Sequence, residues 1–285
     1  MLKLSSRQKS FVVLGIVPLA GFVLAMQLPP MAAGALLHPA RHHVAPGAPE
    51  NCQDAVFVSE GITLKGWRCH AATPKRGTII YLHGVGDNRV SSAGVIQRFV
   101  NRGFDVVAYD SRAHGESDGE SCTYGYFEKS DLHRVIDTLS NDRVILIGSS
   151  MGAAVALQEM ADDPRVVGAV AAESFSDLRT VATERAPFFL TDSTIRKAFN
   201  LAEQQAGFSI DAVNVVEAAR RIAVPVLLIH GDMDRDTPPE HSQRIFSVLH
   251  SPKRLILVPG AKHNESLKGT VWPEIERWID SEAIR

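Results

Sequence analysis

Short apolar runs alternate with amphipathic segments along most of the chain. Strands that are apolar throughout are expected at 77–83, 104–110, 143–148, 166–172, 224–230 and 254–258. Helical periodicity marks the intervening segments 91–102, 127–139, 151–161, 238–249 and 271–281. Strands that are buried on both faces and alternate with helices predict an α/β fold with a mostly parallel central sheet flanked by helices.

Two shorter strands precede this pattern, on either side of a turn at 59–62. If the turn is centred between Glu60 and Gly61, antiparallel pairing places Cys52 opposite Cys69, within bridging distance. In an oxidising compartment the two cysteines would form a disulfide. The alternative is a pair of small buried hydrophobic residues, because a register error of one residue would separate them. Cys122 remains as a single thiol.

A stretch of about fifty residues between Glu173 and Val224 contains no convincing strand. It holds helical patches at 175–185, 195–206 and 211–221, which Pro187 and Gly207 interrupt. We expect this insertion, at about 175–222, to lie over the strand ends as a small helical cap.

The N-terminus has a different character. Lys3, Arg7 and Lys9 precede an uncharged apolar run at 11–26, an order typical of a secretory signal or a signal-anchor. The strict run is shorter than the roughly 20 residues of a membrane span. Only its extension to residue 37 is long enough, and the proline pair at 29–30 is expected to kink or end that helix.

We interpret residues 1–37 as an uncleaved signal-anchor, with a cleaved signal peptide as the alternative. The anchor predicts a protein of the cell membrane with a single N-terminal pass. Cleavage near 33–35 would give a secreted or periplasmic protein, and either way the main domain lies outside the cytoplasm. Proline-rich sequence at 38–51 is expected to be a linker, and residues 52–285 form the domain.

Composition narrows the choice of partners. Lysine and arginine number 30 and the acidic residues 32, so the net charge is −2, and no long basic run occurs. This balance argues against nucleic acid as a partner. No cluster has the spacing of metal ligands, and His42-His43 is interpreted as solvated linker. We therefore expect neither a metal nor an organic cofactor.

The strand at 143–148 runs directly into a helix through Gly148-Ser149-Ser150-Met151-Gly152. Gly-x-Ser-x-Gly between a strand and a helix is typical of a nucleophile on a strained turn, where both glycines allow close approach of the chains. The helix N-terminus also favours negative charge. We therefore predict Ser150 as the nucleophile. Ser149 is the neighbouring alternative, but it is out of register with the glycines.

A serine nucleophile needs a base and an orienting acid, and both are expected after strand ends of a parallel sheet. His263, which follows the strand at 254–258, is the natural base. His241 and His250 lie within or at the end of a helix and are worse placed. The strand at 224–230 is followed by three candidate acids, namely Asp232, Asp234 and Asp236.

An oxyanion hole needs two hydrogen-bond donors. We expect one to be the backbone N–H of Met151, directly after the nucleophile. The second is expected in the loop after the strand at 77–83, where glycines flank Val85 and make its N–H the best candidate. His83 in the same loop is interpreted as a structural residue that orders the loop by hydrogen bonds.

The segments at 81–89, 109–117, 148–152, 230–238 and 260–263 together resemble the α/β-hydrolase superfamily, in particular bacterial membrane-anchored Bem46-like and prolyl-oligopeptidase-like serine hydrolases. The resemblance runs from about residue 56 to the C-terminus and implies an α/β-hydrolase fold. The pattern His-Gly-x-x-Asp-x-x-x-Pro at 230–238 implies Asp234 as the acid. Ala113 departs from the glycine that such relatives often have, in a loop interpreted as structural.

These features predict a serine hydrolase that cleaves a small-molecule carboxylic ester through an acyl-enzyme. Ser150 attacks, His263 transfers the proton, and Asp234 holds the imidazole. The alternative is an exopeptidase or amidase with the same triad. A non-catalytic scaffold is a further interpretation, which the intact set of triad residues disfavours.

Overall fold

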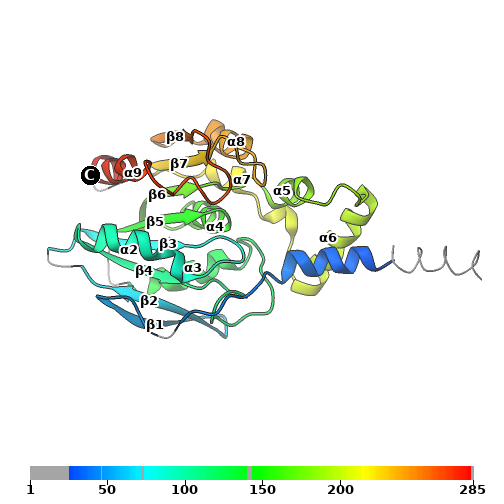
Figure 1. Ribbon diagram of the computed structural model, residues 1–285, viewed down its shortest axis with the longest axis horizontal. Helices are drawn as coiled ribbons and strands as arrows, with labels where there is room; N and C mark the ends of the chain where they lie inside the picture. The colour runs from blue at the N-terminus through cyan, green and yellow to red at the C-terminus, as the bar shows by residue number, and fades with distance from the viewer. Residues whose placement is uncertain (1–25, 46, 72–73, 140–142, 284–285) are drawn as a thin grey trace, which may run out of the picture.

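The computed structural model describes residues 26–45, 47–71, 74–139 and 143–283. Its centre is an eight-stranded sheet with the order β1-β2-β4-β3-β5-β6-β7-β8 (Figure 1). The first two strands form an antiparallel hairpin at one edge, and the other six are parallel to one another. The bounds are β1 Cys52–Ser59, β2 Ile62–Cys69, β3 Gly77–Leu82, β4 Phe104–Tyr109, β5 Val144–Ser149, β6 Val166–Ala172, β7 Val226–Gly231 and β8 Lys253–Val258. The predicted mostly parallel sheet is confirmed.

Helices cover both faces of the central sheet, so the strands β3 to β7 are buried almost throughout, whereas the edge strands β1 and β8 carry several exposed residues. On β3, Ile79 and Tyr81 pack into one core, whereas Ile80 and Leu82 pack into the other. The first core contains residues of the helices α2 (Ala93–Val100) and α9 (Trp272–Trp278), the latter continuing as η3 (Ile279–Ala283). The second contains residues of α3 (Glu128–Asp137), α4 (Met151–Glu159), α7 (Val215–Ala219) and α8 (Glu240–Val248).

The cap occupies the chain between β6 and β7 and consists of α5 (Leu178–Glu184), α6 (Asp192–Ala206), η2 (Ile210–Ala212) and α7. Thr191 caps the N-terminus of α6 with its side chain, and Gly207, with a left-handed φ of 65°, ends the helix. In Figure 1, α5 and α6 project beyond one end of the sheet.

Residues 26–37 are helical and lie beside α6 (Figure 1). The prolines at 29–30, expected to kink or end the helix, do not end it, because the helix continues past them to residue 37 and buries Ala33 and Leu37 completely. The predicted apolar run at 11–26 lies, apart from Met26, outside the described residues. Among the residues that are described, no helix has both the length and the apolar character needed to cross a membrane.

The expected linker is hydrogen-bonded along the domain. The His38 ring (Nδ1) lies 2.8 Å from the carbonyl of Glu120, and Arg41 donates to the carbonyl of Ser117 at 2.7 Å. Further along, the side chain of Asn88 donates to the carbonyl of His42 at 3.0 Å. These contacts attach residues 38–42 to two loops of the domain.

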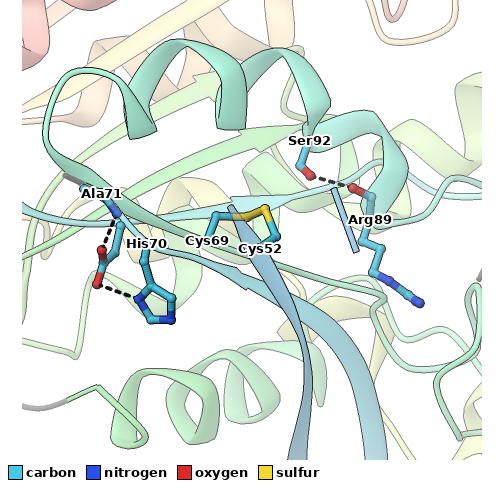
Figure 2. Close-up of a disulfide and its surroundings, with 7 residues drawn as sticks. Cys52, Cys69, His70, Ala71, Arg89 and Ser92 are labelled. Carbon is cyan, nitrogen blue, oxygen red and sulfur yellow. Dashed lines mark hydrogen bonds and ion pairs between the residues drawn. A yellow bond between two sulfur atoms is a disulfide. The ribbon is translucent and has the colours of Figure 1, made fainter. Parts of the chain in front are cut away.

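Cys52 and Cys69 are register partners across the β1–β2 hairpin and form a disulfide (Figure 2). The register predicted from the turn is confirmed, with Phe57 opposite Leu64. Both residues at the turn, Glu60 and Gly61, have positive φ, as a tight hairpin turn of this kind requires. The disulfide joins the edge strand to β2, and β2 pairs with β4 in the main sheet.

Candidate active site

Ser150 lies at the junction of β5 and α4, with φ at 51°. A positive φ is strained for a residue with a side chain, so the surrounding structure must hold it. Its N–H donates to the carbonyl of Ala172 at 2.8 Å, and its carbonyl accepts the N–H of Ala154. The turn therefore fixes the nucleophile between two strands and a fully buried helix.

The two glycines of the motif are required because the backbone around them leaves no room for a Cβ atom. A Cβ on Gly152 would lie 2.2 Å from the carbonyl oxygen of Leu82, and one on Gly148 would lie 2.5 Å from the backbone of Ala153. Neither contact can be relieved by rotating a side chain, because the neighbouring atoms belong to the backbone. The sharp strand-to-helix turn at Ser150 thus depends on glycine at both positions.

The structure brings the three predicted triad residues together. Oγ of Ser150 lies 3.0 Å from Nε2 of His263, and Nδ1 of His263 lies 2.7 Å from Oδ2 of Asp234. Both distances are those of hydrogen bonds. Asp234 follows β7 and His263 follows β8, so adjacent parallel strands deliver both side chains to the same edge of the sheet.

Asp234 is buried yet ionised. Burial alone would raise its pKa, but hydrogen bonds with His230 and His263 and from the N–H of Thr237 outweigh burial and hold the pKa well below its usual range. Its second oxygen, Oδ1, accepts the N–H groups of Asp236 and Thr237 at 3.0 and 2.9 Å. The carboxylate is therefore fixed in position and charge beside the imidazole.

The other acids of the loop do not contact His263. Asp232 is exposed and accepts the N–H of Gly260 at 2.7 Å. Asp236 is also exposed, and it lines the cavity in front of Ser150. Of the other two candidate histidines, His241 is buried between Ser176 and Glu184, and His250 is exposed after α8.

The loop of the predicted oxyanion hole adjoins the nucleophile. Val85 shares with Ser150 the wall of a cavity of about 240 Å³, and a Cβ on Gly84 would lie 3.5 Å from that of Ser150. Met151, the other predicted donor, is the first residue of α4 and is buried. His83 orders the loop, since its Nδ1 lies 2.8 Å from the carbonyl of Gly84 and its Nε2 accepts the N–H of Ser111.

Glu173 is a site residue that sequence reasoning missed. It follows β6, is 1 % exposed, and has a positive φ of 56°. Its carboxylate accepts the N–H groups of Asn264, Glu265 and Ser266 at 2.6, 3.2 and 2.9 Å, and it lies 4.0 Å from Nδ1 of His263. Glu173 therefore anchors the loop that carries the base. The only sequence signal was an acid directly after a buried strand.

Arg185 is a second missed residue. It ends α5, and its guanidinium reaches the catalytic cavity, where it donates to the carbonyl of Asp236 at 2.7 Å. The same guanidinium lies 3.3 Å from Nε2 of His263. The cap thus contributes a positive charge directly beside His263, the predicted base, and no sequence motif indicates this.

Two trios in the described part of the chain bring potential metal-ligating atoms close together. One consists of Glu173, Asp234 and His263, whose contacts are given above. The other joins α3 to the end of α4 and the turn that follows, and its two carboxylates are buried; its members are His133, Glu159 and Asp163. Arg165 already pairs with Asp163 at 2.6 Å.

Two family models match the chain. The model of the prolyl oligopeptidase family matches residues 130–279, just over half of the chain, and includes all three triad positions. The model of the S33 serine aminopeptidases matches residues 73–186, which include the loop of Val85 and the turn of Ser150.

Proteins of similar sequence include the uncharacterised YqkD of Bacillus subtilis, which is 29 % identical over an alignment of 230 residues; the alignment covers 75 % of this chain and 74 % of YqkD. The uncharacterised YfhR of Escherichia coli K12 is 27 % identical over 226 residues, with the same coverage.

Among solved structures, the esterase Pf2001 of Pyrococcus furiosus superimposes with a TM-score of 0.69 at 24 % identity, over 86 % of this chain and 99 % of the esterase. The acylaminoacyl peptidase of Pyrococcus horikoshii gives a TM-score of 0.65 at 14 % identity, over 82 % of this chain and 42 % of the peptidase. At these identities the likeness concerns the fold.

Proposed function

This chain belongs to the prolyl oligopeptidase family of α/β-hydrolases, and on that premise we propose that it hydrolyses carboxylic esters through an acyl-enzyme on Ser150. The observation that carries the proposal is the continuous hydrogen-bonded series from Ser150 through His263 to the ionised Asp234. A serine, an imidazole and a carboxylate in this order form the arrangement that activates a hydroxyl as nucleophile.

In the proposed mechanism, Asp234 accepts the Nδ1–H of His263 and so leaves the lone pair of Nε2 directed at the hydroxyl of Ser150. His263 takes the hydroxyl proton as Ser150 attacks the carbonyl carbon, and then returns it to the leaving alcohol. Water repeats the sequence to release the acid. The backbone N–H groups of Val85 and Met151 stabilise the oxyanion, and losing one such donor typically costs about 3 kcal/mol of barrier.

Amide hydrolysis by the same triad is the second candidate. The serine aminopeptidase model and the fold of the acylaminoacyl peptidase support it, whereas the fold of the esterase supports ester hydrolysis. We favour the ester because the cap of this chain holds an apolar cavity next to the catalytic one, with Arg185 in the wall of both.

The test compares p-nitrophenyl esters with aminoacyl p-nitroanilides. We expect ester turnover that Ser150→Ala reduces by at least about a thousandfold. Ser149→Ala is the matched control and should retain activity and labelling by a fluorophosphonate probe. Efficient anilide turnover with little ester turnover would establish the amidase instead. Ester turnover that survives in Ser150→Ala would contradict the triad.

We further propose that the N-terminal segment holds the protein at the cell membrane with the domain outside the cytoplasm; secretion after cleavage is the alternative. The basic flank of the apolar run and the Cys52–Cys69 disulfide support an oxidising compartment. Thiol alkylation of denatured protein from intact cells should modify Cys122 alone until a reductant is added. Alkylation of all three cysteines without reductant would contradict this location. Fractionation then separates an anchored from a released protein.

A further inference from the structure

A cavity of about 380 Å³ lies between the helix of residues 26–37 and the cap helices α5 and α6. Leu36, Val181 and Phe199 represent its three walls. Among the described residues that line it, only Tyr124 and Arg185 carry polar side-chain groups. The hydroxyl of Tyr124 is already used, since it donates to the carbonyl of Leu36 at 2.9 Å. The cavity is therefore apolar and has the size of a small-molecule site.

The apolar cavity adjoins the catalytic one. Arg185 lines both, and its guanidinium bonds Asp236 and approaches His263 on the catalytic side. Tyr124 lies two residues after Cys122, whose sulfur is 3.3 Å from the sulfur of Met151, the residue next to the nucleophile. Arg185 is the residue that the linings of the two cavities share.

We propose that this cavity binds the alkyl chain of the substrate's acyl group, so that the helix of residues 26–37 forms part of the substrate site. The proposal rests on the proposed ester hydrolysis, with the ester carbonyl at Ser150. Each methylene that enters an apolar site strengthens binding by up to about fourfold, which favours medium and long chains over acetate. The exposed side chains of Met31 and Phe189 line the cavity and give its opening an apolar rim.

The kinetic test uses the full-length protein and two substitutions that each fill the cavity with a large side chain, one from each of two opposite walls. Ala35→Trp acts from the N-terminal helix, and Ala182→Trp acts from α5. Gly34→Trp is the matched control, because Gly34 adjoins Ala35, is absent from the lining, and has no atom within 4 Å of a built Cβ. We expect each filling variant to lose at least tenfold in kcat/KM for p-nitrophenyl decanoate, with p-nitrophenyl acetate changed less than twofold. Equal losses on both esters, or none, would overturn the proposal.

A binding test separates this proposal from the proposed function. In the Ser150→Ala background, dansyl-labelled undecanoic acid should bind, Ala35→Trp should weaken binding at least tenfold, and Gly34→Trp should leave it unchanged. Fatty-acid binding of this pattern without any ester turnover by the unmodified enzyme refutes ester hydrolysis and leaves the cavity assignment supported. If the enzyme turns over the acetate ester, shows no dependence on chain length and does not bind the fatty acid, the cavity assignment is refuted and the proposed ester hydrolysis is not.

Discussion

Nη2 of Arg185 lies 3.3 Å from Nε2 of His263, the ring nitrogen that accepts the proton of Ser150 in the proposed mechanism. The hydroxyl of Ser150 faces the same nitrogen at 3.0 Å. One lone pair therefore has two donors, of which only the hydroxyl leads to reaction. Arg185 also bonds Asp236 and Thr237, so it joins the end of α5 to the loop of the triad acid.

Replacing Arg185 tests this competition. We expect Arg185→Met to raise kcat for a short ester by about two- to tenfold, because a single hydrogen bond is worth ~0.5–1.5 kcal/mol. Stopped-flow or steady-state assay of p-nitrophenyl acetate measures the change. Arg179→Met is the control, since Arg179 lies on the same helix and pairs with Asp211 away from the base. A fall in kcat would show that the guanidinium assists the reaction.

The three acids after β7 are distinguished by substitution. We expect Asp234→Asn to lower kcat by at least about a hundredfold, because the amide no longer fixes the tautomer and charge of the imidazole. Asp232→Asn and Asp236→Asn are matched controls, as both side chains are exposed and neither contacts His263. Comparable losses in a control would move the role of the acid to that residue.

Glu173 is expected to act as a positioning residue. Glu173→Gln removes a buried charge that accepts three N–H groups from the loop of His263, and should destabilise the protein by about 1–3 kcal/mol. Because the base is then less well positioned, kcat should fall while KM changes little. Glu265→Gln in the same loop is the control. Lost stability with unchanged kcat would restrict Glu173 to a structural role.

The buried side chain of His114 is expected to make the free energy of unfolding depend on pH. Burial, with the neighbouring His83 as a second cause, lowers the pKa of His114 to about 4. The ordinary value is 6.5, so folding keeps His114 neutral, and its contribution is present above pH 6.5 and lost as the pH falls toward 4. Near pH 5 the loss from this group is about 2 kcal/mol.

Urea unfolding at pH 7 and pH 5 measures this dependence. His114→Gln should reduce the difference between the two free energies of unfolding, even though it lowers both. His250→Gln, at an exposed position, should preserve the difference seen in the unmodified protein. If His114→Gln leaves the difference between the free energies of unfolding at pH 7 and pH 5 unchanged, His114 is not the source of the pH dependence.

Ala113 occupies a backbone position that favours glycine. Its φ is 62°, and a left-handed conformation costs a residue with a Cβ about 1–2 kcal/mol. A backbone position of this kind is the one to which glycine is best suited, which agrees with the glycine that the resemblance led us to expect here. Ala113→Gly should therefore stabilise the protein by about 1 kcal/mol, less the entropy that glycine gains in the unfolded chain. Thermal unfolding of the Ala113→Gly variant tests this prediction, and a lowered Tm would show that the backbone at Ala113 is not strained.

The periodicity of the chain was sufficient to predict the sheet because the five strands β3 to β7 are almost entirely apolar and buried. Helix boundaries were less well predicted. The helix expected from residue 91 begins at Ala93, since Asn88 caps a 3₁₀ turn at Arg89–Ser92 by accepting the N–H of Val90. The disulfide could not be decided from sequence, because a slip of one residue in the hairpin would separate the cysteines.

The predicted triad residues meet because parallel strands end at one edge, so their order along the chain is enough to bring them together. Arg185 could not be predicted in the same way. Its position depends on where α5 lies relative to the strand ends, and the placement of a helix in three dimensions produces no local sequence motif. Glu173 follows a strand as the triad residues do, but it belongs to no pattern of spacing that marks a loop anchor.

The attachment of residues 38–42 to the domain has a consequence for access to the enzyme. If residues 1–25 enter a bilayer, the domain is held near the membrane surface, because residues 38–42 are bound to the domain and do not act as a flexible linker. Ser150 then lies close to the bilayer, and molecules moving within the plane of the lipid meet the site at a high effective concentration. The hydrogen bonds from Arg41 and Asn88 would thereby help select two-dimensional over three-dimensional diffusion as the route of supply.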